Sequence, residues 1–424
     1  MTVGGHEVRV RDDDLIVAVD VGSCKVVVAI ATLDDMGELS VIGLGCSESS
    51  TGVKEGCIIN INSITEAITE AVNQAEMQAG REVKSVFIAV SGKDVKSQNE
   101  LGFSTASGVN KEIRRNDIER AVELAKGIAI SSDRRIMHVL PRWYKVDRQD
   151  NIQDPLGMFG TRLEANVHII TTAESAIGNV LRCFERMNIG VNSIFLQNIA
   201  DARAVLSDDE KELGVLLLDI GAETTNVSVY YKQAPLYTTV FQKMGGDQIT
   251  FDLSKGFGIP LGTAEKLKCE MGVADYSCVD ESAKIQIPAV GGRPAKIHNR
   301  SEVVDYIQPR LLEIFGTIRE RLKENDLLEC INGGVVIIGG TALLPGIEAV
   351  AQQVFGVAVR VGALKVLGGL GDKINSPEYS VVNGVLELGA ELANYEGGAE
   401  VKARRSDGKD TFMNKVSDFF KQFF

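Results

Sequence analysis

Two stretches far apart in the chain repeat one pattern: VAVDVGSCKVVVAI at 17–30 and LLLDIGAETTNVSV at 216–229. Each has an apolar strand, an aspartate, an apolar residue, a glycine, small polar residues and a second apolar strand. Asp20 and Asp219 occupy equivalent places. The glycine allows close approach to the backbone, whose N–H groups can bind phosphate oxygens in such a turn. A carboxylate at the strand end can hold a hydrated Mg²⁺ beside a phosphate.

A third glycine turn, IIGGTALLPG at 337–346, follows another apolar run. Either aspartate turn alone is also compatible with an ordinary hairpin. Two copies in corresponding halves, together with the third turn, favour a nucleotide clamped between two lobes. The sequence has no P-loop motif and no strand-linked G-x-G-x-x-G, which disfavours P-loop and dinucleotide-binding Rossmann proteins.

The amino-acid composition limits the class of protein further. The chain has 424 residues, 44% of them hydrophobic and 24% charged, as in ordinary globular proteins. Strand-like runs alternate with helical ones, which predicts an α/β fold. The net charge of −13, with no basic domain, argues against broad binding to nucleic acid. Seven scattered cysteines and four histidines show no metal-ligand spacing.

The trio of turns resembles the two phosphate motifs and the adenosine motif of the actin-like ATPase superfamily. Within it, the chain resembles the FtsA family of bacterial cell-division proteins. The segments that carry this resemblance are SVFIAVSGKDVKSQNELG (85–102), MHVLPRWYKVD (137–147), DPLGMFGTRLEANVHIIT (154–171) and IPAVGGRPAKIHNR (287–300). The likeness runs from about residue 15 to 395. It implies an actin-like two-lobed α/β fold with an inserted FtsA-type IC subdomain and a C-terminal amphipathic helix.

The resemblance also implies a division of the chain into subdomains. The expected ranges are subdomain IA at 1–84, 167–197 and 372–395, the IC insertion at 85–166, subdomain IIA at 198–245 and 311–371, subdomain IIB at 246–310, a flexible linker at 396–410 and a membrane-targeting amphipathic helix at 411–424. The linker prediction also rests on the charged, aperiodic composition of EGGAEVKARRSDGKD at 396–410.

Roles for single residues follow from the same resemblance, with ATP and Mg²⁺ as the implied ligands. Asp20 and Asp219 match the two magnesium-side aspartates, and Gln197 matches a residue that can position the attacking water. Lys25 matches a lysine that reaches the phosphates, although an exposed strand lysine is the alternative. The other implied nucleotide-binding residues are Gly22, Ser23, Cys24, Gly221, Thr224, Glu265, Lys268, Gly339, Gly340 and Thr341. Glu265 and Lys268 also fit an exposed helical charge pair.

Three departures from the family pattern bear on activity. Ala222 and Glu223 stand where many relatives carry glycines, and Asn226 stands where an aspartate is common. A carboxylate beside the γ-phosphate would repel it unless the side chain faces away. We therefore expect ATP binding with slow or conditional hydrolysis.

The resemblance implies three kinds of partner besides other division proteins. The C-terminal peptide of the tubulin-like protein FtsZ would bind subdomain IIB, where Arg293, Lys296 and Arg300 form either a basic receptor or a solvated loop. The chain itself would polymerise through subdomain IC. Membrane lipids would meet the tail TFMNKVSDFFKQFF at 411–424 on the cytoplasmic face of the membrane at the division site.

The tail has its own pattern. On a helical wheel its apolar side chains fall within an arc of about 140°. They are Phe412, Met413, Val416, Phe419, Phe420, Phe423 and Phe424. A helix of this length is too short to span a bilayer, but it can lie in the interface. A helix docked on its own domain or in a partner's groove is the alternative. For the whole chain, the alternatives are a type IV pilus assembly protein and a sugar-kinase-like phosphotransferase.

Overall fold

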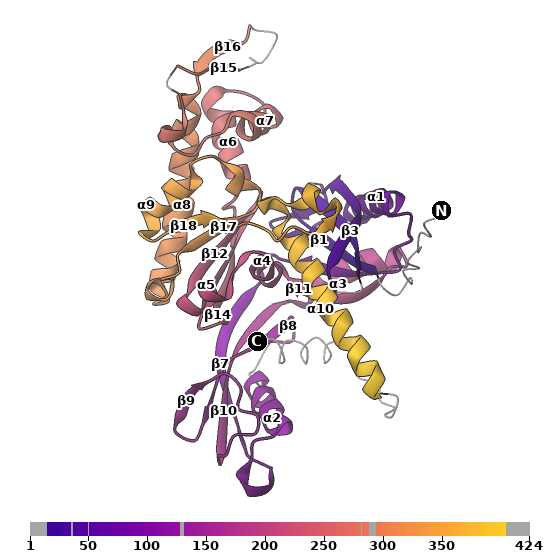
Figure 1. Ribbon diagram of the computed structural model, residues 1–424. Helices are drawn as coiled ribbons and strands as arrows, with labels where there is room; N and C mark the ends of the chain where they lie inside the picture. Colours follow the sequence, from indigo (N-terminus) through magenta and orange to yellow (C-terminus); the bar gives the residue numbers. More distant parts are fainter. Residues whose placement is uncertain are drawn as a thin grey trace, which may run out of the picture.

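The computed structural model describes residues 15–34, 37–49, 51–127, 131–280, 282–287 and 294–403, with side chains up to 394. Two mixed sheets form two lobes, and an antiparallel sheet inserted into the first lobe forms a third body (Figure 1). The insert, with α2, β7, β9 and β10, projects away from the sheets of both lobes (Figure 1).

The first lobe is built on a six-stranded sheet in the order β11-β6-β1-β2-β3-β19. Its strands are β1 (Leu15–Val21), β2 (Lys25–Leu33), β3 (Leu39–Glu48), β6 (Ser85–Val90), β11 (Gly190–Leu196) and β19 (Gly368–Gly369). Side chains alternate across β1, so Ile16 and Ala18 enter one core and Val17 and Val19 enter the other. Helices α1 (Ile61–Ala79) and α3 (Glu174–Arg186) cover one face, and α4 (Gln197–Val205) and α10 (Ser380–Ala403) cover the other. A short hairpin of β4 (Val53–Lys54) and β5 (Cys57–Ile58) precedes α1.

The second lobe repeats this plan with a five-stranded sheet in the order β14-β13-β12-β17-β18. Its strands are β12 (Val215–Ile220), β13 (Thr224–Tyr231), β14 (Ala234–Gln242), β17 (Val335–Ile338) and β18 (Val359–Val361). Its helices are α5 (Asp208–Leu213), α6 (Gly246–Phe257), α7 (Leu261–Met271), α8 (Ser301–Glu324) and α9 (Ile347–Phe355). Helix α8 buries Val303, Ile307, Leu311, Ile314 and Ile318 at helical spacing. The hairpin of β15 (Lys284–Ile287) and β16 (Lys296–Asn299) lies at the far end of this lobe (Figure 1).

The insert is a four-stranded antiparallel sheet in the order β7-β10-β8-β9. It consists of β7 (Lys96–Thr105), β8 (Arg134–Val146), β9 (Gln149–Ile152), β10 (Arg162–Ala173) and helix α2 (Arg115–Lys126). Helix α2 lies so close to β7 that a Cβ on Gly102 would stand 1.9 Å from the carbonyl oxygen of Ala121. The insert also contacts the second lobe, since the Ser97 hydroxyl donates to the carbonyl of Thr238 at 2.7 Å.

Several elements cross the expected subdomain boundaries. Strand β6 pairs in parallel with β1, so the insert begins after β6 rather than at residue 85. Strand β10 stays in the insert's sheet through Ala173, beyond the expected end at 166. Helix α8 is continuous across 310–311. The chain has already returned to the first lobe when β19 pairs with β3 at Gly368. Local sequence cannot assign β6, β10 and β19 to their sheets because strand pairing decides this.

The C-terminal helix also differs from expectation. Helix α10 continues to Ala403, so helical backbone replaces the first part of the linker expected at 396–410. The expected amphipathic helix at 411–424 lies outside the described residues. No helix in the described ranges is both long and apolar enough to cross a membrane.

Candidate functional site

The two aspartate turns have the same local structure in the two lobes. The N–H of Gly22 donates to the carbonyl of Lys25 at 3.0 Å, and the N–H of Gly221 donates to that of Thr224 at 3.0 Å. In each lobe the aspartate-bearing strand pairs antiparallel with the next strand and parallel with a later one. The strand–turn–strand arrangement predicted from the repeated pattern is therefore confirmed.

A chain of side-chain hydrogen bonds joins the two aspartates across the lobes. The amide of Gln197, at the start of α4, donates to Asp20 at 2.7 Å. The amide of Asn226, on β13, donates to Gln197 at 3.1 Å and to Asp219 at 2.8 Å. The hydroxyl of Ser91 donates to Asn226 at 2.5 Å. The structure thus brings Asp20, Gln197 and Asp219 together, and it adds Ser91, which sequence reasoning missed.

The carboxylates in this region have strongly perturbed acidity. Burial, together with the charge of Asp219, raises the pKa of Asp20 to about 7, although the Gln197 hydrogen bond and Lys25 oppose this. Burial raises the pKa of Asp219 to about 6 despite the bond from Asn226. Burial and the charge of Asp219 also raise the pKa of Asp201, whose carboxylate accepts from the Ser380 hydroxyl at 2.8 Å. Such carboxylates favour a proton or a cation in the site.

Helix α6 begins against the second aspartate turn. The N–H of Gly246 donates to the carbonyl of Gly221 at 2.9 Å, and that of Asp247 donates to Ala222 at 2.8 Å. A Cβ on Gly245 would stand 2.4 Å from the Ala222 carbonyl oxygen, so only glycine fits there. Sequence reasoning missed this segment. Two adjacent glycines before a helix start were the available signal, because helix N-termini bind anions.

The third glycine turn, which contains Gly339 and Thr341, and helix α7 lie beside the second aspartate turn. Gly339 has φ 85° and lies so close to Asp219 that a Cβ would stand 2.4 Å from its Oδ1. The hydroxyl of Thr341 donates to the carbonyl of Gly221 at 3.3 Å. Lys268 Nζ donates to the carbonyl of Gly246 at 3.1 Å and pairs with Glu265 at 2.7 Å. The predicted residues of the second lobe are therefore adjacent, and Glu265 and Lys268 do form a helical charge pair.

On the first lobe, Lys25 has a partner that the sequence did not indicate. Its ammonium lies 2.5 Å from Glu378 and 4.1 Å from the centre of the Tyr379 ring. Burial lowers the pKa of Lys25, but the hydrogen bond and charge of Glu378 outweigh this, so the pKa is raised. Lys25 is therefore not an isolated strand lysine, because it is paired with Glu378.

The remainder of the first turn faces the second lobe. Burial and the charges of Asp247 and Glu265 raise the pKa of Cys24. The hydroxyl of Ser23 accepts from the N–H of Gly56 at 3.2 Å. Glu223 of the second lobe reaches the first lobe, where its carboxylate accepts from the N–H of Glu55. The Glu223 carboxylate in the second aspartate turn therefore has a backbone partner in the first lobe.

The residues predicted to bind partners lie elsewhere. Lys296 is exposed on β16, while Arg300 precedes α8 and its Nε donates to the carbonyl of Met271 at 3.1 Å. Arg293 and the seven apolar tail residues Phe412, Met413, Val416, Phe419, Phe420, Phe423 and Phe424 lie outside the described residues. No three His, Cys, Asp or Glu side chains in the described ranges are grouped to hold a metal ion.

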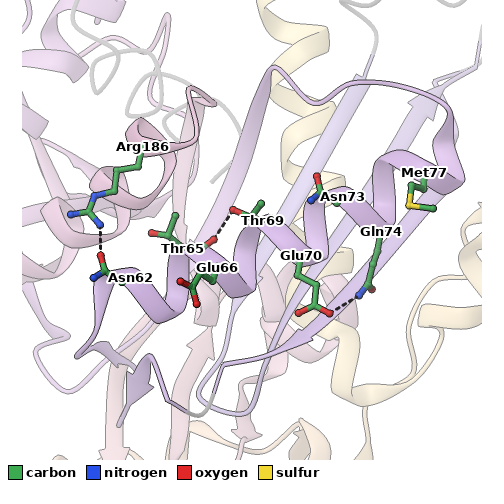
Figure 2. A pocket seen from close by; sticks show the side chains of 9 residues that line it. All are labelled: Asn62, Thr65, Glu66, Thr69, Glu70, Asn73, Gln74, Met77 and Arg186. Atoms are coloured by element: carbon green, nitrogen blue, oxygen red, sulfur yellow. Dashed lines mark hydrogen bonds between the residues drawn. The ribbon is translucent and has the colours of Figure 1, made fainter.

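A separate hollow of about 670 Å³ lies along the outer face of α1, with Arg186 of α3 at one end (Figure 2). Arg186 donates to Asn62 at 2.7 Å, and Met77 lies at the other end (Figure 2). None of its lining residues belongs to the two aspartate turns. The chemistry of the aspartate site is therefore separate from this hollow.

Comparison with solved structures defines the class. The fold resembles the PilM–PilN type IV pilus biogenesis complex, with a TM-score of 0.64 at 17% identity over 88% of this chain and 98% of that one. It also resembles MreB5 of Spiroplasma citri bound to ADP, with a TM-score of 0.54 at 12% identity over 91% and 99% of the two chains. A family model described as the SHS2 domain inserted in FtsA matches residues 92–171. The molecule is thus an actin-like two-lobed protein that carries an SHS2 insert.

The family follows from sequence. The model of cell division protein FtsA matches residues 216–384. Cell division protein FtsA of Pseudomonas aeruginosa is 34% identical over 380 residues, covering 90% of each chain. That of Borreliella burgdorferi is 34% identical over 412 residues, covering 97% of this chain and 98% of the relative. The chain belongs to the FtsA family of cell-division proteins.

Proposed function

We propose that this protein binds ATP with Mg²⁺ between its lobes, polymerises on the cytoplasmic membrane and tethers FtsZ there during division. The observation that carries the nucleotide part is the hydrogen-bonded chain from Asp20 through Gln197 and Asn226 to Asp219. Each lobe contributes one carboxylate and one glycine turn to it. Family membership supports the role in division, and the FtsA match makes the pilus and kinase alternatives less favoured.

The residues present fit a divalent cation. Asp20 and Asp219 are buried and repel one another when both are ionised, and burial is the main cause of their raised pKa values. A hydrated Mg²⁺ would supply compensating positive charge beside the phosphates. The spiroplasma relative by fold has been solved with ADP and with AMPPNP, which supports nucleotide binding at this site.

Hydrolysis is proposed to be slow or conditional. Gln197 is only 7% exposed, and both its amide nitrogen and its amide oxygen are engaged. It must leave one of these bonds before it can orient a water molecule. Asn198, its neighbour, donates to the hydroxyl of Ser228 at 2.9 Å and to the carbonyl of Val227 at 3.3 Å.

Gly340→Asp tests the nucleotide site. A Cβ at Gly340 would meet nothing within 4 Å, so the variant is expected to fold while placing an anion in the adenosine turn. Calorimetric titration should show loss of Mg-ATP binding. Gly178→Asp is the matched control, because Gly178 is equally open and lies on α3. Equal ATP affinity in the two folded variants would contradict the assignment.

Membrane attachment is proposed to reside in the tail at 411–424. Each buried phenylalanine contributes at most about 1.5–3 kcal/mol, so one tail binds reversibly and a polymer binds firmly through many tails. Phe419→Glu and deletion of 411–424 should both release the protein from liposomes in a flotation assay. Asn414→Glu, on the polar side of the predicted helix, should still float. Flotation of the deletion variant at the wild-type level would locate the anchor elsewhere.

Polymerisation is proposed to use the insert. Several of its large apolar side chains are exposed, including Phe103 at 56%, Val109 at 72% and Phe159 at 73%. Exposed apolar side chains on a projecting body are typical of an association surface. Phe159→Ser should reduce sedimentation on lipid, whereas Met77→Ser, at an 84% exposed residue of the first lobe, should not. Equal sedimentation of both variants would exclude this surface.

Binding of the FtsZ peptide is proposed at the basic segment Arg293, Lys296 and Arg300. Charge complementarity to an acidic peptide predicts binding that weakens with salt. Reversal of all three charges to glutamate should abolish binding in fluorescence anisotropy at low salt. Lys373→Glu, at an exposed lysine of the first lobe, is the control. Normal binding by the triple variant would place the peptide elsewhere.

A further inference from the structure

A second polar cavity lies where the insert meets the second lobe. Its volume is about 330 Å³, and its polar lining comes from Arg142, Gln153, Asp208, Lys211 and Gln233. Arg142 belongs to β8 of the insert, and Lys211 belongs to α5 of the second lobe. None of these residues takes part in the aspartate site described above.

A β-bulge in the sheet of the insert sets the direction of the Arg142 side chain. In the pairing of β8 with β10, Trp143 is opposite Asn166 and Pro141 is opposite Val167, so Arg142 is the extra residue of a β-bulge. Bulges redirect side chains and are common beside binding sites. The guanidinium donates to Asn166 from Nη1 at 2.9 Å, while its buried Nε bonds to no atom of the described residues. An unsatisfied charged donor of this kind is costly to bury.

Lys211 is the second cation in this cavity. Its residue is 8% exposed, and the carboxylate oxygen nearest to its ammonium, from Asp208, is 4.0 Å away. That separation is too long for a hydrogen bond, and the Asp208 side chain is 90% exposed. Burial lowers the pKa of Lys211 despite the neighbouring carboxylates. Two of those, Glu387 and Glu391 on α10, are paired with Arg203.

The charge balance of the cavity points to the kind of ligand. Two cations face it, and no carboxylate among the described residues hydrogen-bonds to either. Asp208 is the one carboxylate in the lining, and it lies 4.0 Å from the Lys211 ammonium with its side chain 90% exposed. The buried Lys211 and the half-buried Arg142 are therefore better compensated when an anion binds between them. Gln153 and Gln233 add amide groups that can donate to oxygen. The size of the cavity suits a small molecule rather than a peptide or a nucleic acid.

We propose that this cavity binds a small phosphate-class oxyanion, free or as the end group of a small metabolite, between Arg142 and Lys211. The guanidinium of Arg142 would contact it from the insert, and the ammonium of Lys211 would face it from the second lobe. The bound anion would hold the insert against the second lobe at a point separate from the Ser97–Thr238 contact. The site is independent of the proposed nucleotide site.

The test measures the melting temperature of the full-length protein with inorganic phosphate against chloride at matched ionic strength. At a phosphate concentration ten times its dissociation constant, the melting temperature should rise by about 2 °C. Arg142→Met and Lys211→Met should each lose this shift, while Arg148→Met, at an exposed arginine of the β8–β9 turn, should keep it. Gly340→Asp should also keep it, which separates this site from the nucleotide site. A larger shift with glycerol phosphate would show that the remainder of the cavity is used.

If the two cations only stabilised the fold, removing Lys211 would lower the melting temperature. The proposal predicts the opposite. Lys211→Met removes a buried charge without a bonded partner, so without phosphate the variant should melt at or above the wild-type temperature. A lower melting temperature in that variant, or a phosphate shift that survives in both Arg142→Met and Lys211→Met, would overturn the proposal. Unchanged ATP affinity in both variants would show that the proposed nucleotide site remains intact.

Discussion

Replacing Asp20 by asparagine should stabilise the nucleotide-free protein while removing its affinity for Mg-ATP. Asp20 and Asp219 come from different lobes and are linked only through the amides of Gln197 and Asn226. When both carboxylates are ionised they repel one another in a buried site. Asparagine keeps an acceptor for the Gln197 amide and removes the charge. The variant therefore separates the electrostatic cost of the site from its hydrogen bonding.

The size of the effect follows from the acidity of Asp20. Its pKa rises from 3.8 to about 7 on folding. A raised pKa stabilises the folded state below pH 3.8, and this contribution is lost as the pH rises through about 7. Each pKa unit corresponds to about 1.4 kcal/mol, so ionised Asp20 lowers the free energy of unfolding by about 4 kcal/mol at pH 8. Because the Asp20→Asn substitution leaves Asp219 buried, we expect the free energy of unfolding to rise by about 2–4 kcal/mol at pH 8.

Thermal melting without nucleotide, at pH 4.5 and pH 8, measures this directly. The melting temperature of Asp20→Asn should exceed that of wild type by roughly 5 °C at pH 8 and by much less at pH 4.5. Asp372→Asn, at an exposed aspartate of the first lobe, should match wild type at both values. Titration calorimetry should show at least a tenfold loss of Mg-ATP affinity in Asp20→Asn. An Asp20→Asn protein that is less stable than wild type at pH 8 would refute the repulsion argument.

Other substitutions test the surroundings of the site. Glu378→Gln removes the carboxylate that pairs with Lys25 at 2.5 Å. Because both side chains are partly exposed, the released lysine should raise ATP affinity only two- to tenfold in calorimetry, a gain of about 1 kcal/mol. Gly384→Ala would place a Cβ 1.8 Å from the carbonyl of Ala200, so α10 and α4 must separate. Its free energy of unfolding should fall by about 3 kcal/mol in urea denaturation, and wild-type stability would contradict that packing. Ser380→Ala removes the donor to buried Asp201 and should cost about 1–3 kcal/mol by the same method.

The parts of the fold that sequence reasoning predicted are those set by local pattern. An apolar strand, an aspartate and a glycine turn determine a hairpin because strand alternation and turn geometry act within a few residues. Two such hairpins in corresponding halves then predicted two lobes, and the structure confirms both turns. The resemblance supplied the insert and the role of each turn, which the local pattern could not.

The parts that sequence reasoning missed depend on contacts between distant segments. Lys25 and Glu378 are 353 positions apart, and nothing near either residue indicates the pair. The predicted start of the insert at residue 85 is wrong because the sequence of β6 fits a strand of either sheet. Only its parallel pairing with β1 assigns β6 to the first lobe. Gly245 and Gly246 were overlooked although they lie in the sequence as a visible pair. Their importance depends on α6 reaching the second aspartate turn, which is a tertiary contact.

A series of contacts leads from the second aspartate turn to the insert. Glu223, in the second lobe, accepts a hydrogen bond from the N–H of Glu55 in the first. The next residue, Gly56, lies against Gly92 so closely that a Cβ on it would stand 2.9 Å from the Gly92 Cα. Gly92 connects β6 to β7 with φ 143°, a conformation open mainly to glycine. The insert is continuous with the first lobe at this point but hydrogen-bonded to the second through Ser97 and Thr238. Asn99 also donates to the carbonyl of Leu236 at 2.9 Å, and His168 bonds to the hydroxyl of Thr238 at 3.0 Å. A change in the angle between the lobes would therefore alter this group of contacts between the insert and the second lobe, or the backbone at Gly92.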